Sequence, residues 1–439
     1  METTNRTRKQ KMSNQNVIDG SPHGLNLTPG RRDTQGNKIL FIAEAVTLAH
    51  VGRMITLANG IDQPRFTPIL AWDDRFNGIV GDLPGPYFPL SSIPTSLFLE
   101  RLYKGQPTYN FETLDRYVRE DLELIHTTSP TAIVGDTRLS LAVSAALAGI
   151  PYINVVNAHW SPFAQTKWVV PQCSFVDTVG PLLGQWGFDL LRPLLFRSYA
   201  KGFDSLLKKW GRPSLGADIR NIYCAGDRTL YPDLPDLIPT TGLPPSHRFM
   251  GPVAWSPDVP VSDILNRPAP GKKTVYVAMG TSGNTRALPA ILEGLAGRPL
   301  RVLVAAGLQL SVRNPDPTRL ELHTSPYFSG QAACQAADLV INNGGSAGIN
   351  QCLLAGVPFL GVASNLDQFS SMYFSERAGV GKTIRADRVN PGAIARQAGE
   401  LLDDPSWGRK AKAISAIAHS YTPSDILMEE LKSLGSVQA

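Results

Sequence analysis

The sequence predicts an α/β protein built from two doubly wound parallel sheets. Short apolar runs typical of strands alternate with segments of helical spacing, and glycine-rich turns follow several of those runs. The chain has 439 residues. Because single cores rarely keep growing beyond about 250–300 residues, this length favours two domains.

A first series of strands and helices begins at Lys38. The run KILFIAEAV indicates a short buried strand, and apolar residues of helical spacing follow it in HVGRMITLA. The pattern returns with a strand at Ala132–Val134, a polar turn at Gly135–Asp136, a helix that ends before Gly149 and a strand at Tyr152–Val156. Strands joined by helices in this way form parallel sheets.

A second series follows a segment rich in proline and charge. Strands are predicted at Val275–Ala278 and Leu339–Ile341, and a glycine-rich turn follows each. The later turn, Asn342–Ser346, leads into a helix at Ala347–Leu354 and then a strand at Phe359–Val362. Ligands of doubly wound sheets bind beyond the carboxyl ends of the strands, so both turns are candidate binding elements.

These elements define an organisation in five parts. A polar tail precedes a first domain, a proline-rich linker connects that domain to a second one, and helices end the chain. The predicted bounds are 1–37 for the tail, 38–254 for the first domain, 255–273 for the linker, 274–409 for the second domain and 410–439 for the terminal helices.

Composition excludes several classes of protein. Hydrophobic residues make up 43% and charged residues 18% of the chain, as in folded globular proteins. The formal net charge is +5, but residues 1–37 hold six Lys/Arg against three Asp/Glu, so the rest carries only +2 and no nucleic-acid partner is expected. No apolar run reaches the roughly 20 residues of a transmembrane helix, and no secretory signal is recognised.

The metal-binding residue types are scattered. The four cysteines lack the spacing of a zinc site or a disulfide framework, which favours a reducing cytoplasm. The histidines show no HxxxH or HExxH spacing and no DxD motif occurs. We therefore expect no bound metal and no cofactor.

A glycine turn that opens a helix can bind an anion. The first amides of the helix lack intrahelical partners and the helix dipole is positive at that end. We expect Ser346 to cap the helix and to donate to a phosphate. A second turn, predicted to approach the same phosphate, consists of Gly280, Thr281, Ser282 and Gly283. For either turn the alternative is a tight connection that needs positive φ and binds nothing.

The stretch INNGGSAGINQCLLAGVPFLGVASNLDQ resembles the donor-binding signature of the family-1 glycosyltransferases of the GT-B fold, which include plant and bacterial natural-product enzymes. The family pattern is His-Gly-Gly-x-Gly-Thr, a Glu five residues later, Ala-Gly-Val-Pro and an Asp/Glu-Gln pair. The resemblance covers most of residues 38–420. It implies two Rossmann-like domains facing each other across a cleft, with terminal helices that pack back on the first domain.

The resemblance also implies which residues contact the donor. The positions that match the pattern, or nearly so, are Gly344, Gly345, Ser346, Gln351, Ala355–Pro358, Asp367 and Gln368. Ser346 and the neighbouring amides would hold a diphosphate. Gln351 would contact the ribose, and Asp367 with Gln368 would bind hydroxyls of the donor sugar.

Two departures from the pattern concern the nucleotide. Asn343 stands where the family has a phosphate-facing His, and its amide can donate a hydrogen bond but carries no positive charge. Tyr327 and Phe328 match the aromatic that stacks on the base, while the Gln that bonds the base edge is missing. The expected donor is a UDP-sugar, with thymidine diphosphate sugars left open. Both aromatics could instead be core residues.

His50 follows the first strand, where the family keeps its catalytic base. Transfer to a hydroxyl needs a group that removes the proton, and an imidazole titrates in the working range. Asp136 lies 86 residues later and resembles the acidic partner that orients such an imidazole. Since both residues follow strands of one sheet, we expect them to meet. The alternatives are a histidine bonded to backbone and an N-cap aspartate.

Residues 157–213 are rich in Trp, Phe and Leu, with basic residues among them. In the resembled family this region lines the acceptor pocket, which implies an apolar or aromatic acceptor bound by Trp160, Phe163 and Trp168. Four further residues have the spacing of one helix face: Trp186, Leu190, Leu194 and Leu195. A core or interdomain face is one alternative for this segment, and a basic amphipathic surface that touches a membrane to reach a lipid acceptor is another.

The sequence thus predicts an inverting, metal-independent hexosyltransferase that acts on small molecules as a monomer or homodimer, with His50 as base and Asp136 as its partner. One alternative is a GT-B nucleotide-sugar 2-epimerase, which needs no acceptor. Another is a noncatalytic nucleotide-sugar binder or auxiliary subunit, whose mark would be loss of the base. A dehydrogenase is disfavoured because no GxGxxG follows the first strand.

Overall fold

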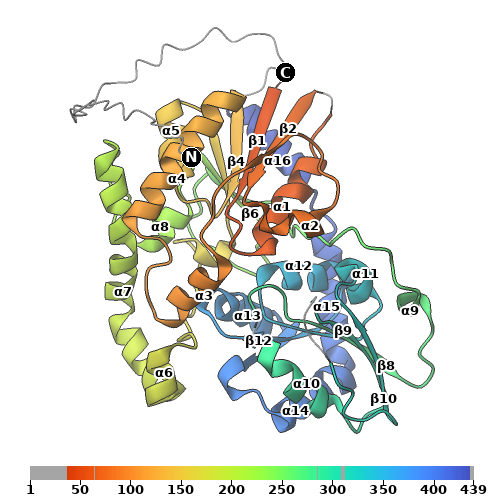
Figure 1. The fold of residues 1–439 in the computed structure, drawn as a ribbon. Coiled ribbons are helices and arrows are strands. Elements are labelled where there is room, and N and C mark those ends of the chain that lie inside the picture. The colour runs from red at the N-terminus through yellow and green to blue at the C-terminus, as the bar shows by residue number, and fades with distance from the viewer. Residues whose placement is uncertain (1–36, 64, 284, 308–311, 436–439) are drawn as a thin grey trace, which may run out of the picture. The chain divides into compact units, whose positions relative to one another are not determined.

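Seven parallel strands form the first sheet of the computed structural model, which describes residues 37–63, 65–283, 285–307 and 312–435. The strands lie in the order β3-β2-β1-β4-β5-β6-β7, and Figure 1 shows β2, β1 and β4 side by side. Their bounds are β1 Asn37–Ala43, β2 Phe66–Trp72, β3 Tyr87–Pro89, β4 Ala132–Asp136, β5 Tyr152–Val155, β6 Arg228–Tyr231 and β7 His247–Phe249. The chain order reverses between β1 and β4, so a crevice is expected at the carboxyl ends of these two strands.

The second sheet has six parallel strands in the order β10-β9-β8-β11-β12-β13. Their bounds are β8 Lys273–Ala278, β9 Leu300–Ala305, β10 Leu320–Ser325, β11 Leu339–Asn342, β12 Phe359–Ala363 and β13 Gly381–Arg385. The order reverses here between β8 and β11. Each half of the molecule therefore has its own switch point, and both predicted glycine turns follow the strands of the second one.

Helices connect the strands. In the first half they are α1 Leu48–Asn59, α2 Asn77–Val80, α3 Thr95–Tyr103, α4 Phe111–Thr128, α5 Leu141–Ala148, α6 Ser174–Val179, α7 Pro181–Lys209 and α8 Ile219–Tyr223. The later helices are α9 Asp263–Asn266, α10 Leu288–Leu295, α11 Gly330–Gln335, α12 Ser346–Ala355, α13 Leu366–Ala378, α14 Pro391–Asp403, α15 Pro405–Ala418 and α16 Pro423–Ser433.

The central strands are buried on both faces, as expected for a parallel sheet covered by helices. In β1 every residue from Ile39 to Ala43 is fully buried. One apolar cluster contains residues of both halves, among them Val156 and Tyr231 from the first and Tyr276 and Phe359 from the second. The two halves therefore share one continuous cluster of buried apolar side chains.

The terminal helix α16 packs on the first half, although it ends the described chain (Figure 1). Leu427 and Leu431 are buried in the same cluster as Met54 of α1. On its outer side Glu430 accepts from Arg228 Nε at 3.1 Å. The helix adds stability to the half that carries His50.

The fold class is confirmed: two Rossmann-like halves carry parallel sheets. Some bounds need correction. The predicted tail lies outside the described residues except for Asn37, which begins β1. The predicted linker 255–273 contains the short helix α9, and its last residue, Lys273, already belongs to β8. Strands β2, β3, β6, β7, β10 and β13 were not predicted.

The linker is held at its start. Gly52 in α1 lies directly against the Trp255 ring, and a Cβ at Gly52 would come within 2.7 Å of it. The Trp255 carbonyl accepts from Gln351 Nε2 of α12 at 2.7 Å. The linker thus contacts a helix of each half. None of the helices within the described residues is long and apolar enough to cross a bilayer.

Candidate active site

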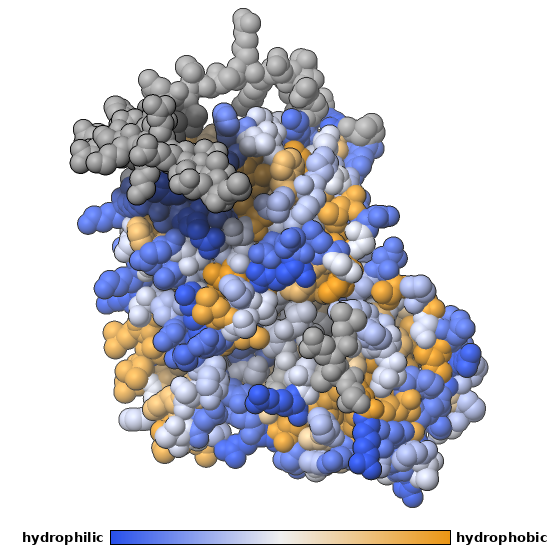
Figure 2. All heavy atoms as spheres, viewed as in Figure 1, coloured by the Kyte–Doolittle hydropathy of each residue, from blue (hydrophilic) through white to orange (hydrophobic). Residues whose placement is uncertain are grey.

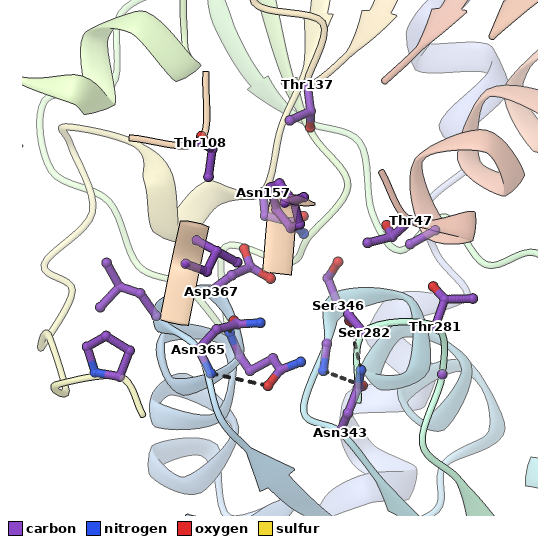
Figure 3. Close-up of a pocket in the computed structure, with 18 of the residues that line it drawn as sticks. Thr47, Thr108, Thr137, Asn157, Thr281, Ser282, Asn343, Ser346, Asn365 and Asp367 are labelled. Atoms are coloured by element: carbon purple, nitrogen blue, oxygen red, sulfur yellow. Dashed lines mark hydrogen bonds between the residues drawn. The ribbon is translucent and has the colours of Figure 1, made fainter. Parts of the chain in front are cut away.

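A cavity of about 760 Å³ lies beyond the carboxyl ends of both sheets and is lined by residues of both halves. Figure 3 shows Thr47, Thr137 and Asn157 of the first half on one side of it, with Ser282 and Ser346 of the second half on the other. Its wall includes most of the predicted site residues: His50, Trp160, Gly280, Thr281, Ser282, Tyr327, Phe328, Asn343, Gly345, Ser346, Gln351, Asp367 and Gln368. Both glycine turns therefore reach the same space.

His50 and Asp136 are in contact. His50 Nδ1 lies 2.9 Å from Asp136 Oδ1, and Asp136 is fully buried behind the imidazole, whose side chain is 20% exposed. The strand register explains why the two side chains are close. Asp136 ends β4 beside Ala43 at the end of β1, and His50 lies in α1, the helix that follows β1. With Nδ1 bonded to the carboxylate, Nε2 is the ring nitrogen left for a group in the cavity.

Asp136 is held by more than the imidazole. Burial opposes its ionisation, but Arg53 and His50 outweigh burial and lower the pKa of Asp136 below its usual value. Arg53 Nη1 donates to Asp136 Oδ2 at 2.9 Å, and Thr137 Oγ1 donates to Oδ1 at 2.8 Å. Thr137 has φ of 60°, a conformation that costs energy for a β-branched residue and marks functional sites. The carboxylate therefore stays ionised and fixed.

Arg53 was not predicted as a site residue, yet it bridges the two halves. The side chain is only 3% exposed and its Nη2 donates to Asn157 Oδ1 and to Ser346 Oγ, both at 3.2 Å. The same guanidinium thus contacts the carboxylate beside His50 and the first residue of α12. It places a positive charge beside the Ser346 hydroxyl, in a turn where Asn343 replaces the family's His.

A second buried network holds the segment between β1 and α1. Arg138 Nη1 donates to Glu44 Oε2, and Arg138 Nε donates to Asp121 Oδ1, both at 3.1 Å. All three side chains are almost fully buried, and the guanidinium also lies 3.6 Å from the centre of the Tyr117 ring. Burial raises the pKa of both carboxyls, with Arg138 opposing that rise. The network fixes the loop that leads into the helix of His50.

The glycine turn before α12 presents free amides one residue earlier than expected. Asn342 Oδ1 accepts from the Gly344 amide at 2.8 Å and Asn343 Oδ1 accepts from the Gly345 amide at 3.0 Å. Gly345, and not Ser346, is the N-cap residue, and its position carries no side-chain cap. Helix geometry leaves the amides at 346–348 without intrahelical acceptors. These amides and the Ser346 hydroxyl face the cavity and suit an anion.

Asn343 joins the two glycine turns. Its Nδ2 donates to Ser282 Oγ at 3.1 Å, a bond drawn in Figure 3. Gly280 has φ of 63°, and a Cβ at Gly283 would collide with the Met279 carbonyl, so this turn needs glycine at both places. The Asn343 amide is thereby used within the protein, and the resemblance alone would have assigned it to a phosphate.

Asp367 at the start of α13 is bound by two side chains of the first half. His159 Nε2 lies 2.8 Å from Asp367 Oδ1, and Trp160 Nε1 donates to the same oxygen at 2.9 Å. Burial opposes ionisation, but the two contacts outweigh it and lower the pKa of Asp367 to about 2. Its Oδ2 has no such partner among the described residues and remains an available acceptor.

Gln368 has a buried donor with no partner. Its Oε1 accepts from the Ser364 amide at 2.8 Å and from the Ser364 hydroxyl at 3.0 Å, which fixes the amide group. Its Nε2 is buried and unbonded within the described residues, although the side chain lies on the cavity wall. Buried donors are rarely left unpaired, so this nitrogen is an unexplained polar group at the cavity wall.

Of the residues predicted to contact the nucleotide, Gln351 and Tyr327 lie on the cavity wall and Phe328 lies mainly in the core. Gln351 lines the cavity and also bonds the Trp255 carbonyl. Tyr327 is half-buried on the wall. Phe328 touches the cavity but is 5% exposed and packs against Tyr276 in the core, so it fits the core alternative better than base stacking.

The expected acceptor residues need correction. Trp160 lines the cavity, but Phe163 and Trp168 do not. Phe163 packs edge-on against His247, and Trp168 packs against Trp160 and Phe196. The apolar wall includes Leu195, which was expected on a helix face of this segment, and residues that were not predicted: Phe98, Leu102, Phe188, Leu191 and Tyr199. The aromatic content of residues 157–213 indicated a segment that lines the cavity, but it did not distinguish side chains on the cavity wall from side chains packed inside the protein.

No group of three or more His, Cys, Asp or Glu side chains within the described ranges could hold a metal ion. The site offers an imidazole on a carboxylate, a guanidinium, free helix amides, and the carboxylate of Asp367 beside the amide of Gln368. These belong together in transfer of a group from a phosphate ester to a hydroxyl.

Curated relatives fit this chemistry. A PGL/p-HBAD biosynthesis glycosyltransferase of Mycobacterium tuberculosis is 37% identical over 378 residues, 86% of this chain and 88% of that one. A PGL/p-HBAD biosynthesis rhamnosyltransferase of Mycobacterium bovis is 37% identical over 384 residues, 88% and 84% of the two chains. A third, named an inactive PGL/p-HBAD biosynthesis glycosyltransferase of Mycobacterium bovis, is 40% identical over 258 residues, 59% and 70%. The chain belongs to the family-1 glycosyltransferases.

Solved structures agree on the fold. The spinosyn forosaminyltransferase SpnP has a TM-score of 0.66 at 16% identity and covers 91% of this chain and 100% of its own. The spinosyn rhamnosyltransferase SpnG complexed with thymidine diphosphate has a TM-score of 0.63 at 15% identity, with coverage of 89% and 99%. No family model matches the sequence. The glycosyltransferase has the GT-B fold predicted from its donor signature.

Proposed function

We propose that the enzyme transfers a hexose or deoxyhexose from a nucleoside diphosphate sugar to a hydroxyl of an apolar acceptor, with inversion. The observation that carries the proposal is the arrangement of His50 on Asp136, facing the uncapped start of α12 across one cavity. A base and an anion site are thus placed on opposite sides of the space where a sugar would sit.

In the proposed reaction His50 Nε2 takes the proton of the acceptor hydroxyl. The oxygen forms a bond to the anomeric carbon as the bond from that carbon to the diphosphate oxygen breaks, and the nucleoside diphosphate leaves with the electron pair. Asp136 stabilises the imidazolium, as in triad chemistry, because its lowered pKa keeps it ionised. Attack opposite the leaving group inverts the anomeric centre.

The departing diphosphate gains negative charge. The amides at 346–348 and the Ser346 hydroxyl lie where they can donate to it, and the guanidinium of Arg53 adds a positive charge 3.2 Å from that hydroxyl. Asp367 Oδ2 and Gln368 Nε2 would bind sugar hydroxyls on the other side. Preorganised groups of this kind can replace a metal ion, and we propose that none is needed.

The names of the relatives support, for this enzyme, a donor and an acceptor of the kind used in PGL/p-HBAD biosynthesis, including rhamnose as donor sugar. The nucleotide is proposed to be UDP or thymidine diphosphate. The four free cysteines support the cytoplasm as the place of action. Among the rivals, the noncatalytic binder is disfavoured by the intact contact between His50 and Asp136.

The proposal is tested by His50→Ala. Loss of the base should lower kcat by about 10²–10⁴-fold, while thermal stabilisation by the nucleoside diphosphate is retained because the anion site is untouched. Initial rates and thermal shifts measure the two effects. His126→Ala, at an exposed histidine near the end of α4, is the matched control.

Undiminished transfer by His50→Ala would overturn the role of the base. Conversion of the nucleotide sugar by the wild-type enzyme without any acceptor would favour the 2-epimerase instead.

A further inference from the structure

A large apolar surface lies on α6 and the first half of α7. Nine large hydrophobic side chains are exposed among the described residues, and seven of them lie here. We call these seven the apolar face: Phe175, Leu182, Leu183, Trp186, Leu190, Leu191 and Leu194. Leu182 is 89% exposed and Trp186 is 72% exposed. Figure 2 shows hydrophobic atoms gathered along the edge where Figure 1 places these helices.

Helix periodicity explains the face. Residues 182, 186, 190 and 194 are four apart and share one side of α7, while Phe196, Phe203 and Leu207 of the second half are buried. The first half of the helix therefore projects a stripe of leucines beyond the core. Monomeric soluble proteins rarely leave such a patch uncovered, so it indicates a binding surface.

The apolar face continues into the active-site cavity. Phe175 and Leu191 belong both to the face and to the cavity wall, and Phe188 and Leu195 of the same helix line the wall behind them. An apolar molecule could pass from the face into the cavity without leaving hydrophobic contact.

Unpaired positive charge lies beside the face. Lys167 and Arg197 are exposed and line a second cavity of about 940 Å³ that runs along α7. Neither has an acidic partner among the described residues, whereas Arg192 in the same cavity pairs with Asp189 at 3.5 Å. Over its length α7 carries five Lys/Arg and two Asp/Glu. Leucines and a tryptophan beside free cations are typical of a helix that lies in an anionic lipid interface.

We propose that α6 and the first half of α7 dock on an anionic lipid surface, with the apolar face in the acyl boundary and Lys167 and Arg197 on lipid phosphates. The docking does not depend on the proposed reaction. The further idea that an apolar acceptor enters the cavity from this surface does rest on the proposed reaction.

A second copy of the chain is the competing occupant. A twofold contact through this face would bring the cations of both copies close together and would cover the side of the cavity that Phe175 and Leu191 form. Both effects oppose a dimer here and favour lipid.

The test is co-sedimentation of the full-length enzyme with vesicles of phosphatidylcholine alone or mixed equally with phosphatidylglycerol. Wild-type protein should pellet with the mixed vesicles, and Trp186→Glu with Leu190→Glu should lower the bound fraction at least tenfold. Val261→Glu, at a 50% exposed apolar residue outside the face, is the matched control and should bind normally. Lys167→Glu with Arg197→Glu should remove the preference for phosphatidylglycerol and its sensitivity to salt.

Thermal stabilisation by UDP or thymidine diphosphate checks that each variant is folded. Failure of the wild type to pellet at low salt would overturn the proposal. So would a dimer, seen by light scattering, that Trp186→Glu with Leu190→Glu dissociates while vesicle binding is absent. Because vesicle binding needs no turnover, an inactive enzyme that still pellets would refute the proposed reaction and leave the docking intact.

Discussion

At the scale of single residues, Arg53 is the side chain that most extends the expected site. It touches Asp136 beside the base and Ser346 beside the proposed diphosphate. No family position suggested it, because an arginine one turn after His50 looks like any polar residue of an amphipathic helix. Its partners lie 83 and 293 residues away, so only the folded chain brings them together.

Arg53→Met should affect both stability and donor binding. Removing one member of a buried ion pair costs roughly 3–5 kcal/mol of unfolding free energy, since Asp136 is left buried without its partner. The affinity for nucleoside diphosphate should fall about tenfold, which is roughly 1.4 kcal/mol. Chemical denaturation and calorimetric titration measure the two effects.

Arg53→Lys keeps the charge and should lie between the wild type and Arg53→Met. Arg409→Met, at an exposed arginine of α15, is the control for loss of a positive charge. Unchanged diphosphate affinity in a folded Arg53→Met would show that the guanidinium serves stability alone.

Asp367 predicts a pH dependence of stability. Its pKa is about 2 in the folded protein against 3.8 ordinarily, so ionisation favours the folded state. The stabilisation is complete above pH about 4 and is lost as pH falls towards 2. The unfolding free energy of wild type should therefore exceed that of Asp367→Asn near neutral pH, and the gap should close on acidification. Denaturation curves measured at descending pH follow the gap, and one that widens would contradict the contact with His159 and Trp160.

At the scale of elements, the turn between β11 and α12 depends on one glycine. Gly344 has φ of 73°, and a Cβ there would lie 2.8 Å from Met372 Cγ. Gly344→Ala should cost about 1–2 kcal/mol for the left-handed backbone, with a further loss as Met372 is displaced. Stabilisation by nucleoside diphosphate should fall with it, because the amides at 346–348 shift.

Gly408→Ala is the matched control for that change. Gly408 lies inside α15 with open space around it, so alanine there should raise the unfolding free energy by up to about 1 kcal/mol. Thermal and chemical denaturation compare the two variants. Equal behaviour of both would show that the turn before α12 tolerates a side chain.

The sequence predicted strands that are apolar along most of their length, and these include β1, β4, β8 and β11, whose carboxyl ends carry the candidate site. It missed β2 because Pro68 interrupts its apolar run, and prolines usually exclude a central strand. It missed β10 and β13, the edge strands of the second sheet, because exposure of one face makes their composition mixed. Phe163 and Trp168 were misplaced for a related reason, since an aromatic side chain serves a core or a pocket wall equally well.

At the scale of the molecule, the proposed donor site draws on both halves. Asp367 and Ser346 of the second half contact His159 and Arg53 of the first. A donor that binds between these groups should stabilise the whole folded chain. At 100 times its dissociation constant the matching nucleotide sugar should add about 2.7 kcal/mol to the unfolding free energy.

A thermal-shift panel of UDP- and thymidine diphosphate sugars, with each free diphosphate beside it, identifies the donor. The sugar itself should add to the shift in wild type but not in Asp367→Ala, where its hydroxyl contact is gone. A panel in which no nucleotide stabilises the enzyme would contradict the donor site as a whole.

Trp255, at the start of the linker, contacts a helix of each half. Its ring lies against the backbone of Gly52, two residues after His50, and its carbonyl accepts from Gln351 in the cavity wall. A rotation of the two halves about the linker would move α1 together with Trp255. Through Trp255 the helix that carries His50 is in contact with the cavity wall that contains Gln351, and we expect a displacement of either one to be transmitted to the other.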